Sequence, residues 1–384
     1  MRILFTFIGG LGHFEPLVPV ARASVAAGHD VAVACSGRLT ARVEAAGFRG
    51  LATSAFRASP PDPRDTSRFA AVDARAAEIE FAENFADKGA RRHATAIQEH
   101  IREWRPDVIV RDEADLGSAI AAEVWGIPTA TVLVLAAGML IRPDLVSAPL
   151  AAIRAEHGLG ADPDLAMLTG GLVLSPFPPL FRSPDSPVQL PESTFFFRSD
   201  HASPPARPEP RSSRKCVYAT LGTVFNSESG DLFERLLAAL GEVDADVLLT
   251  VGKDLDPAVL GPRPDHIRIE QFVPQDEVLP TTDLVVSHGG SGSLMATLAH
   301  GLPSVLLPLG ADQPHNAARA QELGLAHVLD AATVTADAIA RSVERALRDE
   351  TTRDRTRRIA DEIRALPSVE ESLPLLERLG ATTR

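Results

Sequence analysis

Residues 283–316 have the sequence DLVVSHGGSGSLMATLAHGLPSVLLPLGADQPHN, and this stretch decides the fold. Leu284–Ser287 is a short apolar run that predicts a buried strand, and His288 with a run of glycines and serines follows it. Leu294–Ala299 then has helical spacing, and Ser304–Leu307 is apolar again. A strand, a glycine-rich turn, a helix and a second strand in this order predict a parallel α/β sheet.

The same alternation continues on both sides of this stretch. The other predicted strands are Ile3–Ile8, Val31–Cys35, Val108–Val110, Thr129–Val134, Val217–Leu221, Val247–Val251 and Ile267–Phe272. The other predicted helices are Pro16–Ala27, Leu39–Ala46, one or two within Phe69–Trp104, Leu116–Val124, Leu232–Leu240, Ala317–Leu323, Ala336–Arg348, Arg353–Ala365 and Val369–Leu379. Residues 201–213 (HASPPARPEPRSS) have the composition of a linker, so we expect two doubly wound domains, 1–200 and 214–367. Ligands bind beyond the carboxyl ends of such strands, so two sheets facing a cleft are expected.

Composition excludes several classes of protein. The 384 residues are 45% apolar and carry a formal net charge of −13, which argues against nucleic acid or an anionic membrane as the main partner. Gly9 and Gly10 interrupt the first apolar run, which therefore indicates a strand and not a signal peptide. No run is long enough to span a membrane, so the expected location is the cytoplasm. Cys35 and Cys216 are interpreted as small buried apolar residues.

The turn at 288–293 has the chemistry of an anion site. Glycines allow a ligand to approach the backbone, and a helix N-terminus offers free N–H groups with a partial positive charge. Ser291 and Ser293 add hydroxyl donors. This arrangement would hold a pyrophosphate without a lysine or a metal, although a plain β–α turn with a serine N-cap explains the local sequence equally well.

Four motifs in register resemble the family 1 glycosyltransferases of the GT-B fold, most closely the bacterial branch that decorates antibiotics and other natural products. By this resemblance the diphosphate is held by His288, Gly289, Gly290, Ser291, Gly292 and Ser293. Asp312 and Gln313 match the pair that binds sugar hydroxyls, and in the segment 271–275 (QFVPQ) Phe272 would stack on the nucleobase while the Val273 backbone bonds its edge. Thr220, Gly222 and Thr223, in the segment 218–223 (YATLGT), would lie near the phosphates. The resemblance also implies that residues 368–384 form a helix that crosses back to the N-terminal domain.

One position departs from the family pattern. Many members that use UDP-glucose carry a glutamate eight residues after the motif histidine, where it clasps the ribose diol. This chain has Ala296 there. Because a deoxyribose lacks one of the two hydroxyls, Ala296 favours a dTDP-sugar donor.

A second cluster follows the first strand, at 9–17 (GGLGHFEPL). His13 lies there beyond the carboxyl end of the strand; alone it could be structural, but in the resembling family this position is the general base. A neutral imidazole can take the proton of an acceptor hydroxyl. The family pattern places a partner carboxylate about 100 residues later, which matches Asp112, with Glu113 and Asp115 as close competitors. Asp112 and Asp115 could instead cap the next helix.

The resemblance therefore implies an inverting, metal-independent transfer of a sugar, in which His13 removes the proton and the turn at 288–293 stabilises the departing diphosphate. The acceptor is expected to be a small natural-product aglycone, and a homodimer or an activating partner protein stays open. No cofactor is expected beyond the donor, because the Asp-x-Asp strings at 162–164, 244–246 and 254–256 lie in turns away from the glycine cluster. The competing hypotheses are a nucleotide-sugar epimerase, a transferase for a lipid-linked sugar and a non-catalytic accessory protein of the same fold.

The segments 52–85 and 138–200 are expected to shape the acceptor pocket. The second segment contains several phenylalanines that could either line an apolar aglycone site or pack in the core: Phe177, Phe181, Phe195, Phe196 and Phe197.

Overall fold

Two parallel sheets organise the chain in the computed structural model, which describes all residues except 56–66, 71–72, 199–213, 223–228, 254 and 382–384. Unit 1 consists of Met1–Ser59, Arg75–Ser199 and Leu366–Arg384. Unit 2 consists of Pro60–Ala74 and Asp200–Ala365. The predicted linker 201–213 lies outside the described residues.

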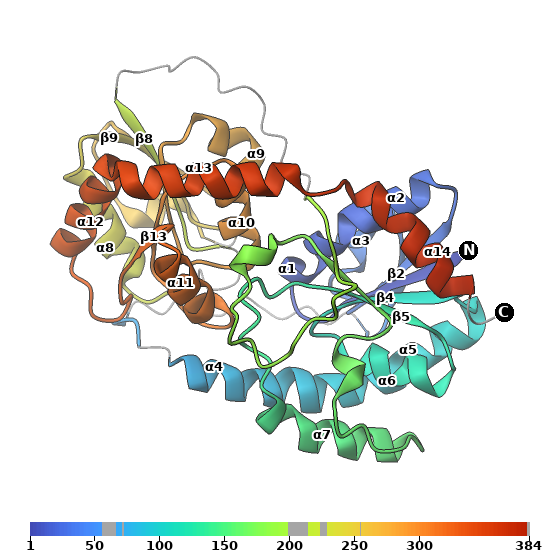
Figure 1. Cartoon of the computed structure of the whole chain (residues 1–384). Coiled ribbons are helices and arrows are strands. Elements are labelled where there is room, and N and C mark those ends of the chain that lie inside the picture. The colour runs from blue at the N-terminus through green and yellow to red at the C-terminus, as the bar shows by residue number, and fades with distance from the viewer. Residues whose placement is uncertain (56–66, 71–72, 199–213, 223–228, 254, 382–384) are drawn as a thin grey trace. The chain divides into compact units, whose positions relative to one another are not determined.

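The sheet of unit 1 has, within the described ranges, seven parallel strands in the order β3-β2-β1-β4-β5-β6-β7 (Figure 1). Its strands are β1 (Arg2–Thr6), β2 (Asp30–Cys35), β3 (Arg49–Ala52), β4 (Val108–Asp112), β5 (Thr129–Val132), β6 (Leu172–Ser175) and β7 (Phe195–Phe196). Its helices are α1 (Leu11–Phe14), α2 (Val18–Ala26), α3 (Thr40–Ala45), α5 (Ala90–Trp104), α6 (Leu116–Val124), α7 (Pro143–Glu156) and α14 (Leu373–Ala381). Helix α4 (Ala74–Phe81) runs into α5 through a π-helical segment, Ala82–Gly89.

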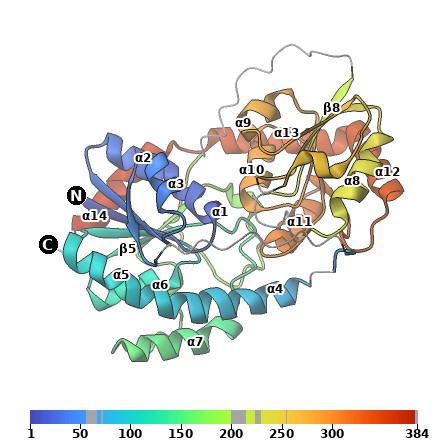
Figure 2. The same cartoon turned by 180° about the vertical axis from the view of Figure 1, so that it is seen from behind.

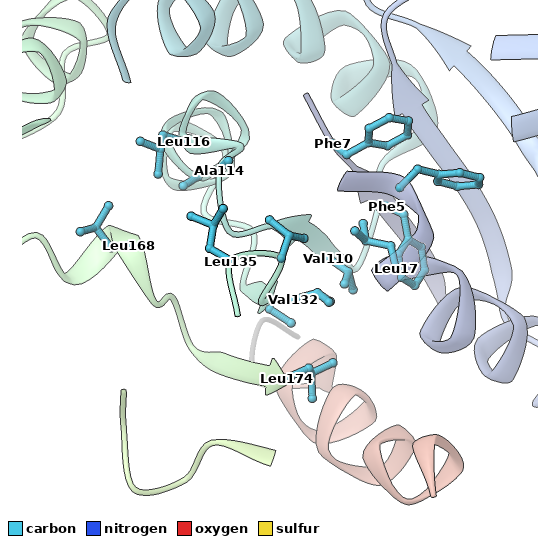
Figure 3. Packing of buried hydrophobic residues seen from close by; sticks show 14 of the residues in the cluster. Phe5, Phe7, Leu17, Val110, Ala114, Leu116, Val132, Leu135, Leu168 and Leu174 are labelled. Atoms are coloured by element: carbon cyan, nitrogen blue, oxygen red, sulfur yellow. The ribbon is translucent and has the colours of Figure 1, made fainter. Parts of the chain in front are cut away.

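Side chains of alternate residues on each central strand enter opposite faces of this sheet. Ile3 and Phe5 of β1 pack in one core, with Leu17 before α2 and Leu376 of α14. Leu4 packs on the other side, in a cluster that holds residues of α5 and α6. Figure 3 shows Phe5, Val110, Val132 and Leu174, from four different strands, gathered in the first core. Because both faces are covered, these strands are almost continuously apolar, and the sequence pattern found β1, β4 and β5 but not the four-residue β6.

The sheet of unit 2 has six parallel strands among the described residues, in the order β10-β9-β8-β11-β12-β13. Figure 2 labels β8 together with the helices of this unit. Its strands are β8 (Lys215–Thr220), β9 (Ala245–Thr250), β10 (Ile267–Glu270), β11 (Leu284–Ser287), β12 (Ser304–Leu306) and β13 (Ala326–Val328). Its helices are α8 (Leu232–Gly241), α9 (Gln275–Val278), α10 (Ser291–Ala299), α11 (Gln313–Glu322), α12 (Ala336–Arg348) and α13 (Glu350–Ala365). Helices α8 and α12 contribute to the core on one face, and Tyr218 and Val285 pack with residues of α9 and α10 on the other.

Each sheet has one point where the order of its strands reverses. In unit 1 the chain proceeds outward from β1 to β3, and then from β4 to β7 in the opposite direction. In unit 2 the corresponding neighbours are β8 and β11. The connections after two such strands leave in opposite directions, so their carboxyl ends remain uncovered and form a ligand site. The predicted two-sheet α/β architecture is confirmed.

Residues 67–70 and 73–74 group with unit 2, although they fall within the predicted N-terminal domain 1–200. Ser67 and Phe69 exchange hydrogen bonds with Asp231: the Asp231 N–H donates to the Ser67 carbonyl at 3.0 Å, and the Phe69 N–H donates to Asp231 Oδ1 at 3.2 Å. Arg68 Nε donates to the Ala332 carbonyl at 3.1 Å, and the Phe69 ring packs against the core of unit 2. Residues 366–384, in contrast, belong to unit 1.

Replacing Phe233 with Ala is expected to lower the free energy of unfolding of unit 2 by about 3–5 kcal/mol, because this fully buried ring fills the core under α8. Urea unfolding followed by circular dichroism measures the change. The matched control is Phe272→Ala, whose ring is 51% exposed and whose loss is expected to cost only about 0.5 kcal/mol. Equal losses in the two variants would contradict this description of the core.

Candidate active site

His13 lies where β1 ends, at the reversal point of unit 1. The Gly9–Gly10 turn leads into the short helix α1, which carries the imidazole. Gly9 has a φ of +92°, and a Cβ there would lie 2.8 Å from His13 Cδ2, so only glycine allows the ring to lie against the turn. His13 Nδ1 is 3.5 Å from Asp112 Oδ2, and the His13 side chain is 20% exposed whereas that of Asp112 is fully buried.

The Asp112 carboxylate is fixed by backbone donors. It accepts hydrogen bonds from the N–H groups of Ile8 at 3.0 Å and Asp115 at 2.9 Å, and a short one from Ala114. Ile8 follows β1 and Asp112 ends β4, so these bonds connect the two neighbouring strands at their carboxyl ends. The bonds orient one carboxylate oxygen toward the imidazole of His13.

The two competing carboxylates have other partners. Glu113 accepts bonds from the N–H groups of Val134 at 3.2 Å and Leu135 at 3.1 Å, and its burial raises its pKa. Asp115 caps α6 through the Ser118 N–H at 3.0 Å and lies 2.8 Å from His93 Nδ1. Among the three carboxylates, Asp112 is therefore the one that the structure places beside His13.

A buried arginine beside these carboxylates was missed by the sequence analysis. Arg111 is fully buried, and its guanidinium donates to the carbonyls of Asp112 and Glu113 and to those of Met167 and Leu168 at 2.7 and 2.6 Å. The strand pattern predicted only an apolar run at this place, and the partners at Met167 and Leu168 are far away in sequence. Arg111 thus connects the end of β4 to the loop before β6.

The N-terminus of α10 lies at the reversal point of unit 2. Its N-cap is Gly290, which offers no side-chain acceptor, and no acidic residue occupies the first turn. Ser291, Gly292 and Ser293 form that turn, and the positive end of the helix dipole there favours an anion. Gln275 Nε2 donates to Ser293 Oγ at 2.8 Å and thereby connects the segment 271–275 to this turn.

His288 lies between two glycines. A Cβ on Gly222 or on Gly290 would come within about 2.7 Å of the imidazole, and Gly222 has a φ of +79°. Burial lowers the pKa of His288 to about 4, although a hydrogen bond with the Thr220 backbone opposes the shift. The imidazole is therefore neutral at pH 7, and its single N–H is directed at the Thr220 backbone.

Asp312 belongs to a polar network around the same turn. Its Oδ2 accepts from Ser291 Oγ at 2.5 Å and from Asn316 Nδ2 at 2.8 Å, and Asn316 Nδ2 also lies 3.0 Å from the Gly289 carbonyl. Asn316 is fully buried and connects α11 to the turn, a role that the sequence analysis did not assign.

Gln313 Oε1 accepts from the Leu309 and Gly310 N–H groups at 2.8 and 3.3 Å, which leaves its Nε2 for a ligand.

The remaining predicted donor residues lie as follows. Phe272 is exposed, and Lys253 Nζ lies 4.5 Å from the centre of its ring. Val273 is half-buried. The hydroxyl oxygen of Thr220 accepts a hydrogen bond from the Gly222 N–H at 3.2 Å. Thr223 lies outside the described residues. Ala296 is fully buried in the apolar cluster with Tyr218, so a glutamate at 296 would be placed among apolar side chains.

Other candidates from the sequence have structural roles or stay apart. Phe177, Phe181 and Phe197 are buried in unit 1, whereas Phe195 and Phe196 are half-buried. Asp162 accepts from two backbone N–H groups, and Asp244 and Asp246 pair with Arg214.

The described part of the chain holds no cluster of three or more His, Cys, Asp or Glu side chains arranged for a metal ion. None of the helices in the described ranges has both the length and the apolar character needed to cross a bilayer.

The His93–Asp115 pair yields a test. Replacing His93 with Phe is expected to lower the free energy of unfolding by roughly 3–5 kcal/mol at pH 6, because it leaves a buried carboxylate without its cation. Burial lowers the pKa of His93, but Asp115 raises it, and the pKa of His93 is raised on balance. Burial raises the pKa of Asp115, but His93 and Ser118 lower it, and the pKa of Asp115 falls to about 2. The charge of His93 therefore stabilises the fold below pH 6.5 and ceases to do so as the pH rises through the raised pKa. Asp115 stabilises it above pH 3.8 and ceases to do so as the pH falls toward 2.

The stability difference between wild type and His93→Phe should thus be largest between about pH 4 and pH 6.5. Urea unfolding over the pH range measures it. His100→Phe, at a partly exposed histidine of the same helix, is the control and should change stability little at every pH. A His93→Phe deficit that does not vary with pH would rule out the charged pair.

Known proteins resemble the chain over its whole length. The family models for the N-terminal and C-terminal domains of the Erythromycin biosynthesis protein CIII-like family match residues 22–146 and 234–379. The L-demethylnoviosyl transferase of Streptomyces niveus is 30% identical, with 94% of each chain covered. The 3-alpha-mycarosylerythronolide B desosaminyl transferase of Saccharopolyspora erythraea is 29% identical over 100% of this chain and 99% of its own.

Solved structures agree with the fold. The glycosyltransferase VinC in complex with dTDP has a TM-score of 0.77 at 23% identity, with both chains covered completely. The spinosyn rhamnosyltransferase SpnG has a TM-score of 0.80 at 23% identity, covering 98% of this chain and 100% of its own. The chain therefore belongs to the Erythromycin biosynthesis protein CIII-like family and is a glycosyltransferase of the GT-B fold, related to enzymes of antibiotic biosynthesis.

Proposed function

We propose that the chain is an inverting, metal-independent glycosyltransferase that moves a deoxysugar from dTDP to a hydroxyl group of a small natural-product aglycone. One observation carries the proposal: the reversal point of unit 1 holds a histidine beside a buried carboxylate, and that of unit 2 holds a glycine-rich helix N-terminus with no acidic residue in its first turn. The first suits the removal of a proton, and the second suits a leaving diphosphate.

On the acceptor side, His13 is the general base. Asp112 lies on the Nδ1 side of its ring, so Nε2 is the nitrogen that takes the proton of the acceptor hydroxyl. The buried carboxylate orients the imidazole and stabilises the imidazolium that forms. Catalysis of this kind is worth roughly 10²–10⁴-fold in rate.

On the donor side, the backbone N–H groups of the first turn of α10 receive the charge that develops on the diphosphate. His288, whose ring packs against Gly222 and Gly290, lies beside this turn and contacts the diphosphate. The hydroxyl attacks the anomeric carbon as the bond to the diphosphate breaks, which inverts the configuration of that carbon. The proton goes to His13, and the nucleotide leaves as the diphosphate.

Two observations support dTDP and a deoxysugar. Ala296 brings no carboxylate for a ribose diol, and it is buried in an apolar cluster. VinC and SpnG have structures in complex with dTDP, and relatives of this chain are named as transferases of desosamine, mycaminose and 2-deoxy-L-fucose. Their names likewise support a macrolide or similar aglycone as the acceptor.

Replacing His13 with Ala is expected to lower kcat by about 10²–10⁴-fold, because the attacking hydroxyl loses its base. The release of dTDP from a dTDP-deoxysugar in the presence of a macrolide aglycone measures turnover. Affinity for dTDP should stay within about twofold, since the nucleotide site lies on unit 2 by this proposal. The control His29→Ala removes a histidine just before β2, at the amino ends of the strands and so at the opposite end from His13. This variant should retain kcat. Full turnover by His13→Ala would refute the assignment.

Addition of dTDP in the presence of EDTA is expected to raise the melting temperature, since no metal bridges the diphosphate. Saturation to 100 times Kd corresponds to about 2.7 kcal/mol of added stability. UDP should give a smaller shift, and Ser293→Asp, which puts a negative charge into the first turn of α10, should abolish both shifts. A dTDP shift that appears only after Mg²⁺ is added would contradict metal independence.

A further inference from the structure

The long helix that follows the first three strands changes from α-helical to π-helical geometry in its middle. Helix α4, the π-helical segment Ala82–Gly89 and α5 form one continuous run from Ala74 to Trp104 (Figure 1). This is the only π-helical segment among the residues that the structure describes. Such segments are rare and often occur at functional sites, because they displace side chains from the positions that an α-helix would give them.

The π-helical segment carries an aromatic ring that stacks on the imidazole of His13. The rings of Phe85 and His13 have centres 5.5 Å apart and planes 18° from parallel. Phe81 stacks on Phe85 in turn, at 5.0 Å and 4°. Phe81 is buried, whereas Phe85 is half-buried, so the stack extends from the core to the edge where His13 lies.

The sequence contains a residue that this helical geometry requires. A Cβ on Gly89 would lie 2.5 Å from the carbonyl oxygen of Asn84, five residues earlier, and 3.5 Å from Ile8 Cδ1. Any side chain at position 89 would therefore disturb the π-helical turn and its approach to the chain segment that leads to His13. Glycine in the interior of a helix costs up to about 1 kcal/mol relative to alanine, so a structural advantage must offset this cost.

Three contacts together define the position of the imidazole. Asp112 lies at its Nδ1, Gly9 lies against Cδ2 and Nε2, and Phe85 covers one face. Since the 3.5 Å separation between His13 and Asp112 exceeds the length of a hydrogen bond, this contact alone leaves the ring orientation loosely defined. The stack on Phe85 restricts the tilt of the ring.

We propose that Phe85 is a positioning residue for the transfer reaction: held by the π-helical segment, it keeps the His13 ring in the orientation in which Nε2 meets the acceptor hydroxyl. This inference rests on the proposed function of His13. A misplaced general base costs up to about 100-fold in rate, so the effect should appear in kcat.

The test compares substitutions of phenylalanine in the full-length protein. Phe85→Leu is expected to lower kcat at least about tenfold with little change in KM for the aglycone, and Phe85→Tyr, which keeps the ring, should retain most of the activity. Gly89→Ala should lower kcat in the same way although it leaves every side chain at the site intact. The matched control is Phe48→Leu, a buried ring of the same core that lies on neither α4 nor the π-helical segment and should keep kcat.

A spectroscopic measurement tests the stack without turnover. In protein with ¹³C-labelled histidine, the ring protons of His13, assigned through His13→Gln, should lie upfield because they lie over an aromatic face. They should move downfield in Phe85→Leu and stay in place in Phe48→Leu.

The outcomes separate this inference from the proposed function. Absence of turnover by the wild type with every dTDP-sugar tested would refute the proposed function, and the His13 resonances would still decide the stack. The positioning role would be overturned if Phe85→Leu left the His13 resonances or kcat unchanged. It would also be overturned if Phe85→Leu raised only KM, which would indicate that Phe85 is a wall of the aglycone site instead.

Discussion

The reversal of strand order within each sheet is the constraint from which the site follows. Neighbouring parallel strands whose connections leave in opposite directions keep their carboxyl ends uncovered. In unit 1 these strands are β1 and β4, which present His13 and Asp112; in unit 2 they are β8 and β11, which present Gly222 and His288. In unit 1 a hydrogen bond from the Ile8 N–H to Asp112 joins the ends of the two strands. In unit 2 the His288 ring packs against Gly222 and holds the corresponding ends together. The strand topology thereby places the residues to which we assign the chemistry.

Unit 1 maintains this geometry by burying an unusual set of charges. Asp112, Glu113 and Asp115 follow one another at the end of β4, and Arg111, Arg182 and His93 lie close to them. Such networks are costly unless every group has a partner, and they contribute specificity of structure more than stability. Each of the three carboxylates has its own partner, so the carboxylate beside His13 is held in one orientation. The arrangement favours a fixed active site over maximal stability.

Much of this architecture was predictable, and the failures have physical causes. Leu116–Val124 and Leu284–Ser287 were predicted with the bounds that the structure shows, because their ends are marked by turn residues and their periodicity is strong. The strands β3, β6, β7 and β13 were missed, because runs of two to four residues are too short for a period to be detected, at the edge of a sheet or, as for β6, inside it. The π-helical segment was also missed, because an apolar pattern does not distinguish it from an α-helix. The glycines revealed His13 and the turn at 288–293, whereas Arg111, His93, Phe85 and Asn316 act through distant partners that a single sequence does not reveal.

The most direct test of the account is the position of the diphosphate in a crystal structure of the full-length protein with dTDP. We expect its β-phosphate oxygens within about 3 Å of the backbone nitrogens in the first turn of α10, with the base stacked on Phe272 and no metal ion between phosphate and protein. A diphosphate bound elsewhere, with the N-terminus of α10 left to solvent, would contradict the assignment of the diphosphate site to the reversal point of unit 2.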